Sequence, residues 1–113
     1  MNLIEGPTYR VTYFPECKRF YDNNKRMLLC VLPFNCYRLF WTNTSNLVMY
    51  ISLEPRGKYI YAILQKRTVH HEPPKGTCFP ENTKFYLWAD TTSYEDDGTG
   101  YLELKTYGIN PLT

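Results

Sequence analysis

Apolar and polar residues alternate along much of the chain, most clearly over Leu47–Leu53, where every second residue is apolar. A period of two indicates a β-strand, because successive side chains of a strand point to opposite faces. The next residues, Glu54–Gly57, carry a Pro and a Gly at positions that favour a tight turn. The alternation resumes over Lys58–Val69, so the sequence predicts a β-hairpin here.

Five further segments have strand composition, either by alternation or as short apolar runs bounded by turn residues. They are Tyr9–Tyr13, Met27–Leu32, Cys36–Trp41, Lys84–Asp90 and Tyr101–Ile109. Residues 16–26 are polar and have room for one short helical turn. About seven strands with at most one short helix predict an all-β antiparallel sandwich or barrel, formed as one domain over residues 1–113.

Composition supports strands over helices. The chain holds eleven Tyr, six Phe and two Trp among its 113 residues, and aromatic rings suit the half-buried face of a sheet. Eight Pro and six Gly interrupt the chain often. No apolar run approaches the length of about 18 residues that a membrane-spanning helix needs.

Four cysteines, Cys17, Cys30, Cys36 and Cys78, bear on both stability and compartment. An even number in a small, loop-rich chain predicts two disulfides, with three possible connectivities. A structural zinc site normally shows two closely spaced ligand pairs, whereas five residues separate Cys30 from Cys36 and no second pair follows. We therefore expect a disulfide-stabilised domain without a metal.

Paired cysteines imply an oxidising compartment, so we expect the protein to be secreted. The first residues have neither the basic nor the apolar region of a signal peptide, and secretion therefore presumes that the signal has been removed. Asn43 begins an Asn-Thr-Ser triplet in a polar stretch, which predicts a glycosylated surface turn.

The spacing of Cys30, Trp41 and Cys78 is compatible with an immunoglobulin domain. The signature is incomplete, because Gly76 occupies the position where that fold has a Tyr. No motif of the chain assigns it to a particular family.

Charge is nearly balanced overall, at +2, but unevenly distributed. Residues 1–67 hold ten Lys and Arg against four Asp and Glu, whereas residues 68–113 hold three against seven. The balance excludes a strongly basic nucleic-acid tail and an acidic disordered segment. The halves either attract each other within the fold or create a bipolar surface that steers a charged partner.

One polar connection between two strands combines cations with aromatic rings. Tyr and Arg dominate the energetics of protein interfaces, so we predict a protein-binding surface there. Its residues are Lys18, Arg19, Phe20, Tyr21, Lys25 and Arg26. A competing site is the acidic loop of residues 91–100, which carries Tyr94. The same mixture of cations and rings also suits single-stranded nucleic acid, although the modest net charge makes that partner unlikely.

One set of residues is a candidate for catalysis. His70 or His71 could act with Glu54 or Glu72 in general acid–base chemistry, with Arg38 or Arg67 stabilising negative charge, as in a small ribonuclease-like hydrolase. Strand alternation sends the two His to opposite faces, so both cannot easily serve one site.

Sequence motifs for phosphate binding, nucleophilic catalysis and calcium binding are not present. The chain has no Gly-rich phosphate loop and no nucleophile elbow. Asp90, Glu95, Asp96 and Asp97 are acidic but lack the alternating pattern of a calcium loop. We therefore expect no cofactor and no metal. The sequence favours a secreted, non-catalytic module of effector or ligand-binding type that acts on an unidentified protein partner; the hydrolase and the nucleic-acid binder are the alternatives.

Overall fold

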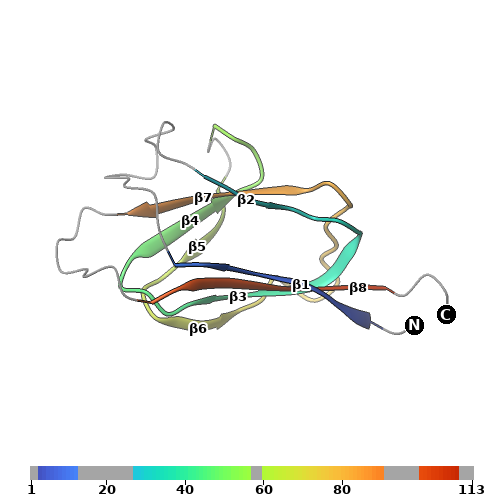
Figure 1. Cartoon of the computed structure of the whole chain (residues 1–113), viewed down its shortest axis with the longest axis horizontal. Helices are drawn as coiled ribbons and strands as arrows, with labels where there is room; N and C mark the ends of the chain where they lie inside the picture. Colours follow the sequence, from blue (N-terminus) through green and yellow to red (C-terminus); the bar gives the residue numbers. More distant parts are fainter. Residues whose placement is uncertain (1–2, 13–26, 57–59, 91–99, 110–113) are drawn as a thin grey trace.

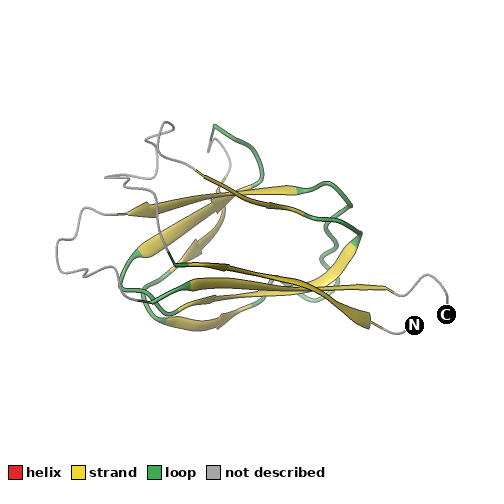
Figure 2. Ribbon diagram, viewed as in Figure 1, coloured by secondary structure: helices red, strands yellow, loops and turns green. Residues whose placement is uncertain are grey.

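The computed structural model describes residues 3–12, 27–56, 60–90 and 100–109, without the side chains of residues 90 and 109. This part of the chain is made of β-strands joined by turns and loops (Figures 1 and 2). The eight strands are β1 (Leu3–Val11), β2 (Met27–Val31), β3 (Cys36–Asn43), β4 (Val48–Ser52), β5 (Ile60–Leu64), β6 (Thr68–His71), β7 (Lys84–Asp90) and β8 (Leu102–Ile109).

Two four-stranded antiparallel sheets face each other, with strand orders β1-β8-β3-β6 and β2-β7-β4-β5. Figure 1 shows them as two layers, and only β4 and β5 are consecutive strands of the same sheet. Every other connection crosses from one sheet to the other. This order is that of a jelly roll. The predicted antiparallel all-β fold is confirmed, and it is a sandwich.

The core between the sheets is built from the apolar faces that alternation predicts. Trp41 of β3 is fully buried and meets Phe85 of β7 edge to face, with ring centroids 5.3 Å apart. Phe79, in the connection before β7, packs against Phe85 at 5.4 Å. These aromatic contacts join the two layers, and rings in this geometry add to the stabilisation from burial alone.

The predicted count of seven strands is wrong by one, because the expected long strand over residues 58–69 is two strands in different sheets. The chain turns at residues 65–67, where Arg67 has a positive φ of 56°. Its backbone N–H donates to Ser45, and the Thr68 hydroxyl closes the turn on the Gln65 carbonyl at 2.7 Å. Three consecutive polar residues, Gln65 to Arg67, are the sequence signal for this break.

β1 begins earlier than expected, at Leu3 instead of Tyr9. This start was not predicted from the sequence because Gly6 and Pro7 are poor strand residues. The strand tolerates them because it lies at the edge of its sheet and its pairing with β8 shifts register between Glu5 and Thr8.

The expected disulfides are absent among the described cysteines: Cys30, Cys36 and Cys78 have free thiols, and Cys17 lies outside the described residues. Cys36 pairs with Phe79 across an antiparallel bridge, and both side chains are buried. Side chains alternate along an extended segment, so Cys78 points the other way, and its side chain is exposed. Thiols that point apart cannot be bridged without backbone movement.

Candidate binding site

The binding residues predicted from the sequence lie outside the described part of the chain. They are Lys18, Arg19, Phe20, Tyr21, Lys25, Arg26 and Tyr94. The structure therefore leaves this prediction open, and the candidate site is built from other residues.

The outer faces of the two sheets differ in exposure. Trp88 of β7 is fully buried even though alternation places it on the face opposite Leu87 and Ala89, which belong to the core. Part of that outer face is therefore shielded from solvent. The other sheet, β1-β8-β3-β6, carries partly exposed aromatic and charged side chains and opens at one end into a groove.

The groove exists because β6 stops pairing with β3. Trp41 lies opposite His71, and two more residues in the same register would place Leu39 opposite Pro73. Proline has no N–H to donate to a sheet, so the ladder ends there. The chain bows outward and returns at Phe79, which exchanges two backbone hydrogen bonds of 2.8 and 2.9 Å with Cys36.

The space between β3 and this bowed loop is an open groove of about 750 Å³. Most of its wall is apolar, and the contributing residues come from three separate parts of the chain. They are Leu3, Tyr37, Leu39, Pro73, Pro74 and Phe79. Leu3 and Tyr37 are 45% and 43% exposed, whereas Phe79 belongs to the core. An apolar concavity of this size is typical of a ligand-binding site.

A tight turn fixes the far wall of the groove. The Pro74 carbonyl accepts hydrogen bonds from the Thr77 N–H at 3.1 Å and from the Thr77 hydroxyl at 2.6 Å. Gly76 is the third residue of this turn and has a φ of 93°, the left-handed conformation that a type II turn requires there. The wall is thus held in place by its own backbone.

Charged groups at the groove rim are linked to one another. The Arg38 guanidinium donates from Nε to Glu72 at 2.9 Å, and His70 Nε2 lies 3.4 Å from the other oxygen of that carboxylate. The hydrogen bond from Arg38, then that from His70, lowers the pKa of the Glu72 carboxyl. Glu72 is therefore ionised over the physiological range. Lys75, also at the rim, forms no ion pair with another described residue.

An aromatic cluster continues from the rim onto the outer face of the sheet. Phe40 lies 4.9 Å from the His70 ring and stacks on Tyr107 at 5.8 Å. The Arg38 guanidinium carbon sits 5.6 Å from the Phe40 ring centre and 5.9 Å from that of Tyr107. Arg38 thus joins the apolar groove to this cluster.

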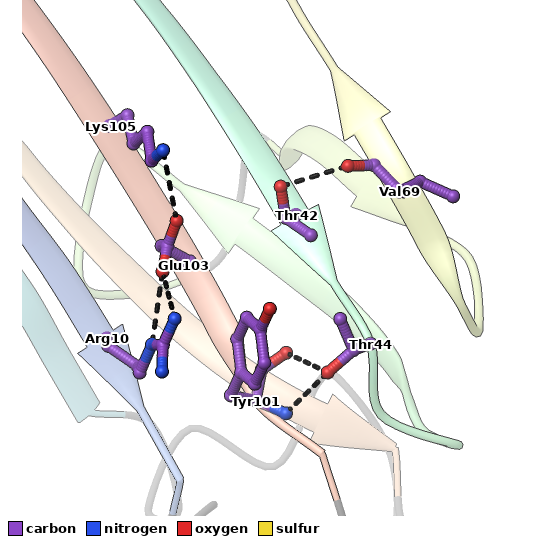
Figure 3. A network of polar contacts seen from close by, with 7 residues as sticks. All are labelled: Arg10, Thr42, Thr44, Val69, Tyr101, Glu103 and Lys105. Atoms are coloured by element: carbon purple, nitrogen blue, oxygen red, sulfur yellow. Dashed lines mark hydrogen bonds and ion pairs between the residues drawn. The ribbon is translucent and has the colours of Figure 1, made fainter.

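The far end of the same face is a self-contained network (Figure 3). Glu103 accepts hydrogen bonds of 2.7 and 3.0 Å from Arg10, and Lys105 lies 3.9 Å away. The Arg10 guanidinium also covers the Tyr101 ring at 4.1 Å. Both arginines described on this face, Arg10 and Arg38, are thus paired with carboxylates.

His70 and His71, the alternative candidates for a catalytic histidine, are separated as their alternation predicts. His70 faces outward against Phe40, whereas His71 lies opposite Trp41, whose side chain points to the core. Of the proposed catalytic partners, the structure brings Glu72 and Arg38 to His70. Glu54 instead accepts the backbone N–H of Arg56 within its own turn.

Asn43, the expected glycosylation site, has a structural role. Its side chain is fully buried, and its amide donates to the carbonyls of Leu47 at 2.8 Å and Gln65 at 3.1 Å. Glycosylation of Asn43 itself stays a prediction. The sequence-based expectation of an exposed turn fails because the polar side chains of the triplet satisfy the backbone of the turn.

The described residues contain neither a cluster of potential metal ligands nor a helix that could span a membrane. No group of three or more His, Cys, Asp or Glu side chains is placed there to hold a metal ion, and the acidic residues Glu95, Asp96 and Asp97 lie outside the described ranges. Within the described ranges no helix has the length and apolar character to cross a bilayer.

Comparisons with known proteins identify no relative: no protein-family model, no curated protein and no solved structure matches the chain. The site must therefore be interpreted from its own geometry. Sequence reasoning missed the groove because its walls are distant in the chain; the run from Pro73 to Gly76 was the available signal.

Proposed function

We propose that this protein is a non-catalytic binding module that acts through protein–protein interaction, with a segment of the partner in the groove. The observation that carries the proposal is the groove of about 750 Å³, whose walls are mostly apolar and whose polar groups are few. Such a surface gains free energy by removing apolar area from water and gains specificity from the few charges at its rim.

The groove is held in shape before a partner arrives. Pro73 and Pro74 restrict the backbone, the turn at Gly76 is hydrogen-bonded, and the ion pair of Glu72 with Arg38 ties the loop to β3. A surface that is already ordered loses less conformational entropy on binding. This arrangement supports recognition in preference to a role as a plain surface loop.

The extracellular location and the effector role expected from the sequence stay predictions. The argument from paired cysteines receives no support from Cys30, Cys36 and Cys78, whose thiols are free. The experiment below therefore compares an extracellular with a cytosolic fraction.

The proposal is tested by affinity capture with the immobilised full chain, followed by mass spectrometry. Tyr37→Ala removes an exposed groove wall, and Ile63→Ala is the matched control, since Ile63 is 50% exposed on β5 in the other sheet. We expect a partner that Ile63→Ala retains and Tyr37→Ala loses. A partner retained equally by both variants would place binding elsewhere, and the fraction that supplies the partner reports the compartment.

A ribonuclease-like hydrolase is the second candidate, favoured by one observation. His70, Glu72 and Arg38 lie together, with His70 Nε2 3.4 Å from the carboxylate that Arg38 holds. Arg38 and His70 are about half exposed, and a cleavage reaction of this type needs both a general acid and a general base. The arrangement supplies one imidazole to do both, so we rank it below binding.

The two candidates give different results in a cleavage assay with purified protein and RNA or DNA. The binding proposal expects no cleavage above background and unchanged partner capture after His70→Ala with His71→Ala. Cleavage by the wild-type chain that disappears in this double variant would reverse the ranking.

A further inference from the structure

The cations at the groove rim are not equivalent. Arg38 is already committed to Glu72 at 2.9 Å, and that carboxylate is kept ionised by its neighbours. Lys75 projects from the turn on the opposite wall, is exposed, and pairs with no described carboxylate. An incoming anionic group would therefore be met by Lys75.

The groove walls determine which uncharged group of a ligand would fit. Pro73 and Pro74 have no N–H groups, so their side of the groove offers rings and carbonyls but few donors. Tyr37 faces them from β3 and is 43% exposed. An apolar side chain held between an aromatic ring and prolines is buried without leaving an unpaired polar group.

The charge pattern also limits how acidic the ligand can be. Glu72 is 35% exposed at the same rim and repels anions, so the groove suits one carboxylate better than a run of phosphates. The groove is open instead of enclosed, which fits a chain that enters and leaves better than a small molecule that must be surrounded.

We infer that the groove binds an extended segment of a partner protein that carries an apolar side chain and, within a few residues, a single carboxylate. The apolar side chain lies between Tyr37 and the two prolines, and the carboxylate lies at Lys75. This inference rests on the proposed function, because it names the ligand chemistry of the same groove.

The test uses the ¹⁵N-labelled full chain and three fluorescein-labelled peptides. The first is Gly-Pro-Leu-Pro-Glu-Leu-Gly, whose prolines favour an extended conformation, and the other two replace Glu by Gln or Lys. We expect the Glu peptide to shift the amide signals of Tyr37–Leu39 and Lys75–Thr77. Since a solvent-exposed ion pair contributes up to about 1 kcal/mol, the Gln peptide should bind about two- to fivefold more weakly.

Charge reversal separates a specific contact from a general effect of charge. Lys75→Glu should lower the affinity for the Glu peptide by about three- to tenfold and make the Lys peptide the better ligand. Lys66→Glu is the matched control, because Lys66 is exposed in the turn between β5 and β6, and it should change neither affinity. Affinity for the Glu peptide should also fall with added salt.

Several results would overturn the inference: no shift with the Glu peptide at millimolar concentration, shifts confined to another surface, or equal binding by the Lys75→Glu and wild-type chains. If Tyr37→Ala loses the natural partner while Lys75→Glu keeps it, the groove function stands and the acidic ligand is wrong. If both variants keep the partner, both proposals are wrong.

Discussion

The Ser45 hydroxyl donates a hydrogen bond of 2.6 Å to the side-chain oxygen of Asn43, and both side chains are fully buried. The Ser45 backbone N–H reaches the same oxygen at 3.0 Å. The Asn43 amide meanwhile donates to Leu47 and to the end of β5 at Leu64 and Gln65. One side chain at the end of β3 thus fastens the connection between the two sheets to the end of β5.

Asn43→Ala should lower the free energy of unfolding by about 2–4 kcal/mol, because it removes several hydrogen bonds and leaves buried carbonyls without donors. Ser45→Ala should have a smaller effect of about 1–2 kcal/mol. Urea denaturation at neutral pH measures both. A loss below about 1 kcal/mol for Asn43→Ala, or a glycan found on Asn43 of the folded protein, would contradict the structural role.

A second prediction concerns Gly108 of β8. A Cβ built there collides with the ring of Phe34, which lies in the connection between β2 and β3. Gly108→Ala should therefore destabilise the fold by about 1–3 kcal/mol through overpacking. Phe34→Ala removes the obstacle, so the double variant should be more stable than the sum of the two single effects predicts. Additive losses in this double-mutant cycle would show that the ring can move aside.

The thiols should react unequally. Burial, with a smaller contribution from Cys36, raises the pKa of Cys30 to about 12, and burial also raises the pKa of Cys36. The thiolate is the reactive form, so both should resist alkylation at neutral pH, whereas exposed Cys78 should react.

Intact-mass analysis in a Cys17→Ser background checks this prediction. We expect one added alkyl group in the native protein and three after unfolding without reductant. Fewer than three after unfolding would indicate a disulfide, and three in the native protein would contradict the burial of Cys30 and Cys36.

The Glu72 carboxylate gives a pH-dependent prediction. Its pKa is lowered in the folded state, so its interactions stabilise the fold above the ordinary glutamate pKa, and this stabilisation is lost as the pH falls through the lowered value. An NMR titration of the Glu72 side chain should show the pKa rising towards the ordinary range in Arg38→Gln. An unshifted Glu72 in this variant would contradict the ion pair.

The sequence predicted the fold class because alternation depends only on neighbouring residues. Met27–Val31 and Lys84–Asp90 were found because their segments are short and rich in apolar residues. The change of sheet at Arg67 was missed, since strand alternation on either side of a sharp turn looks continuous. The jelly-roll order could not be predicted, because it depends on contacts between strands that are distant in the sequence.

The candidate site was harder to predict from the sequence than the fold. Leu3, Tyr37 and Pro73 become neighbours only when three segments of the chain meet, and no local pattern records that meeting. For Asn43 only the expected exposure is wrong, because its side chain is buried by contacts with residues that the triplet does not include. The predicted basic and aromatic segment, Lys18–Arg26, lies outside the described residues and stays a prediction.

The pairing of β1 with β8 places Leu3 directly opposite Ile109, so both ends of the described chain leave from the same end of the sandwich. Leu3 also lines the groove. A peptide fused to either end through a short flexible linker would therefore reach the groove at an effective concentration in the millimolar range. Even a weak ligand would then occupy the groove in cis and exclude a free partner, so the linker length of a fusion protein would set how much of the groove is open to others.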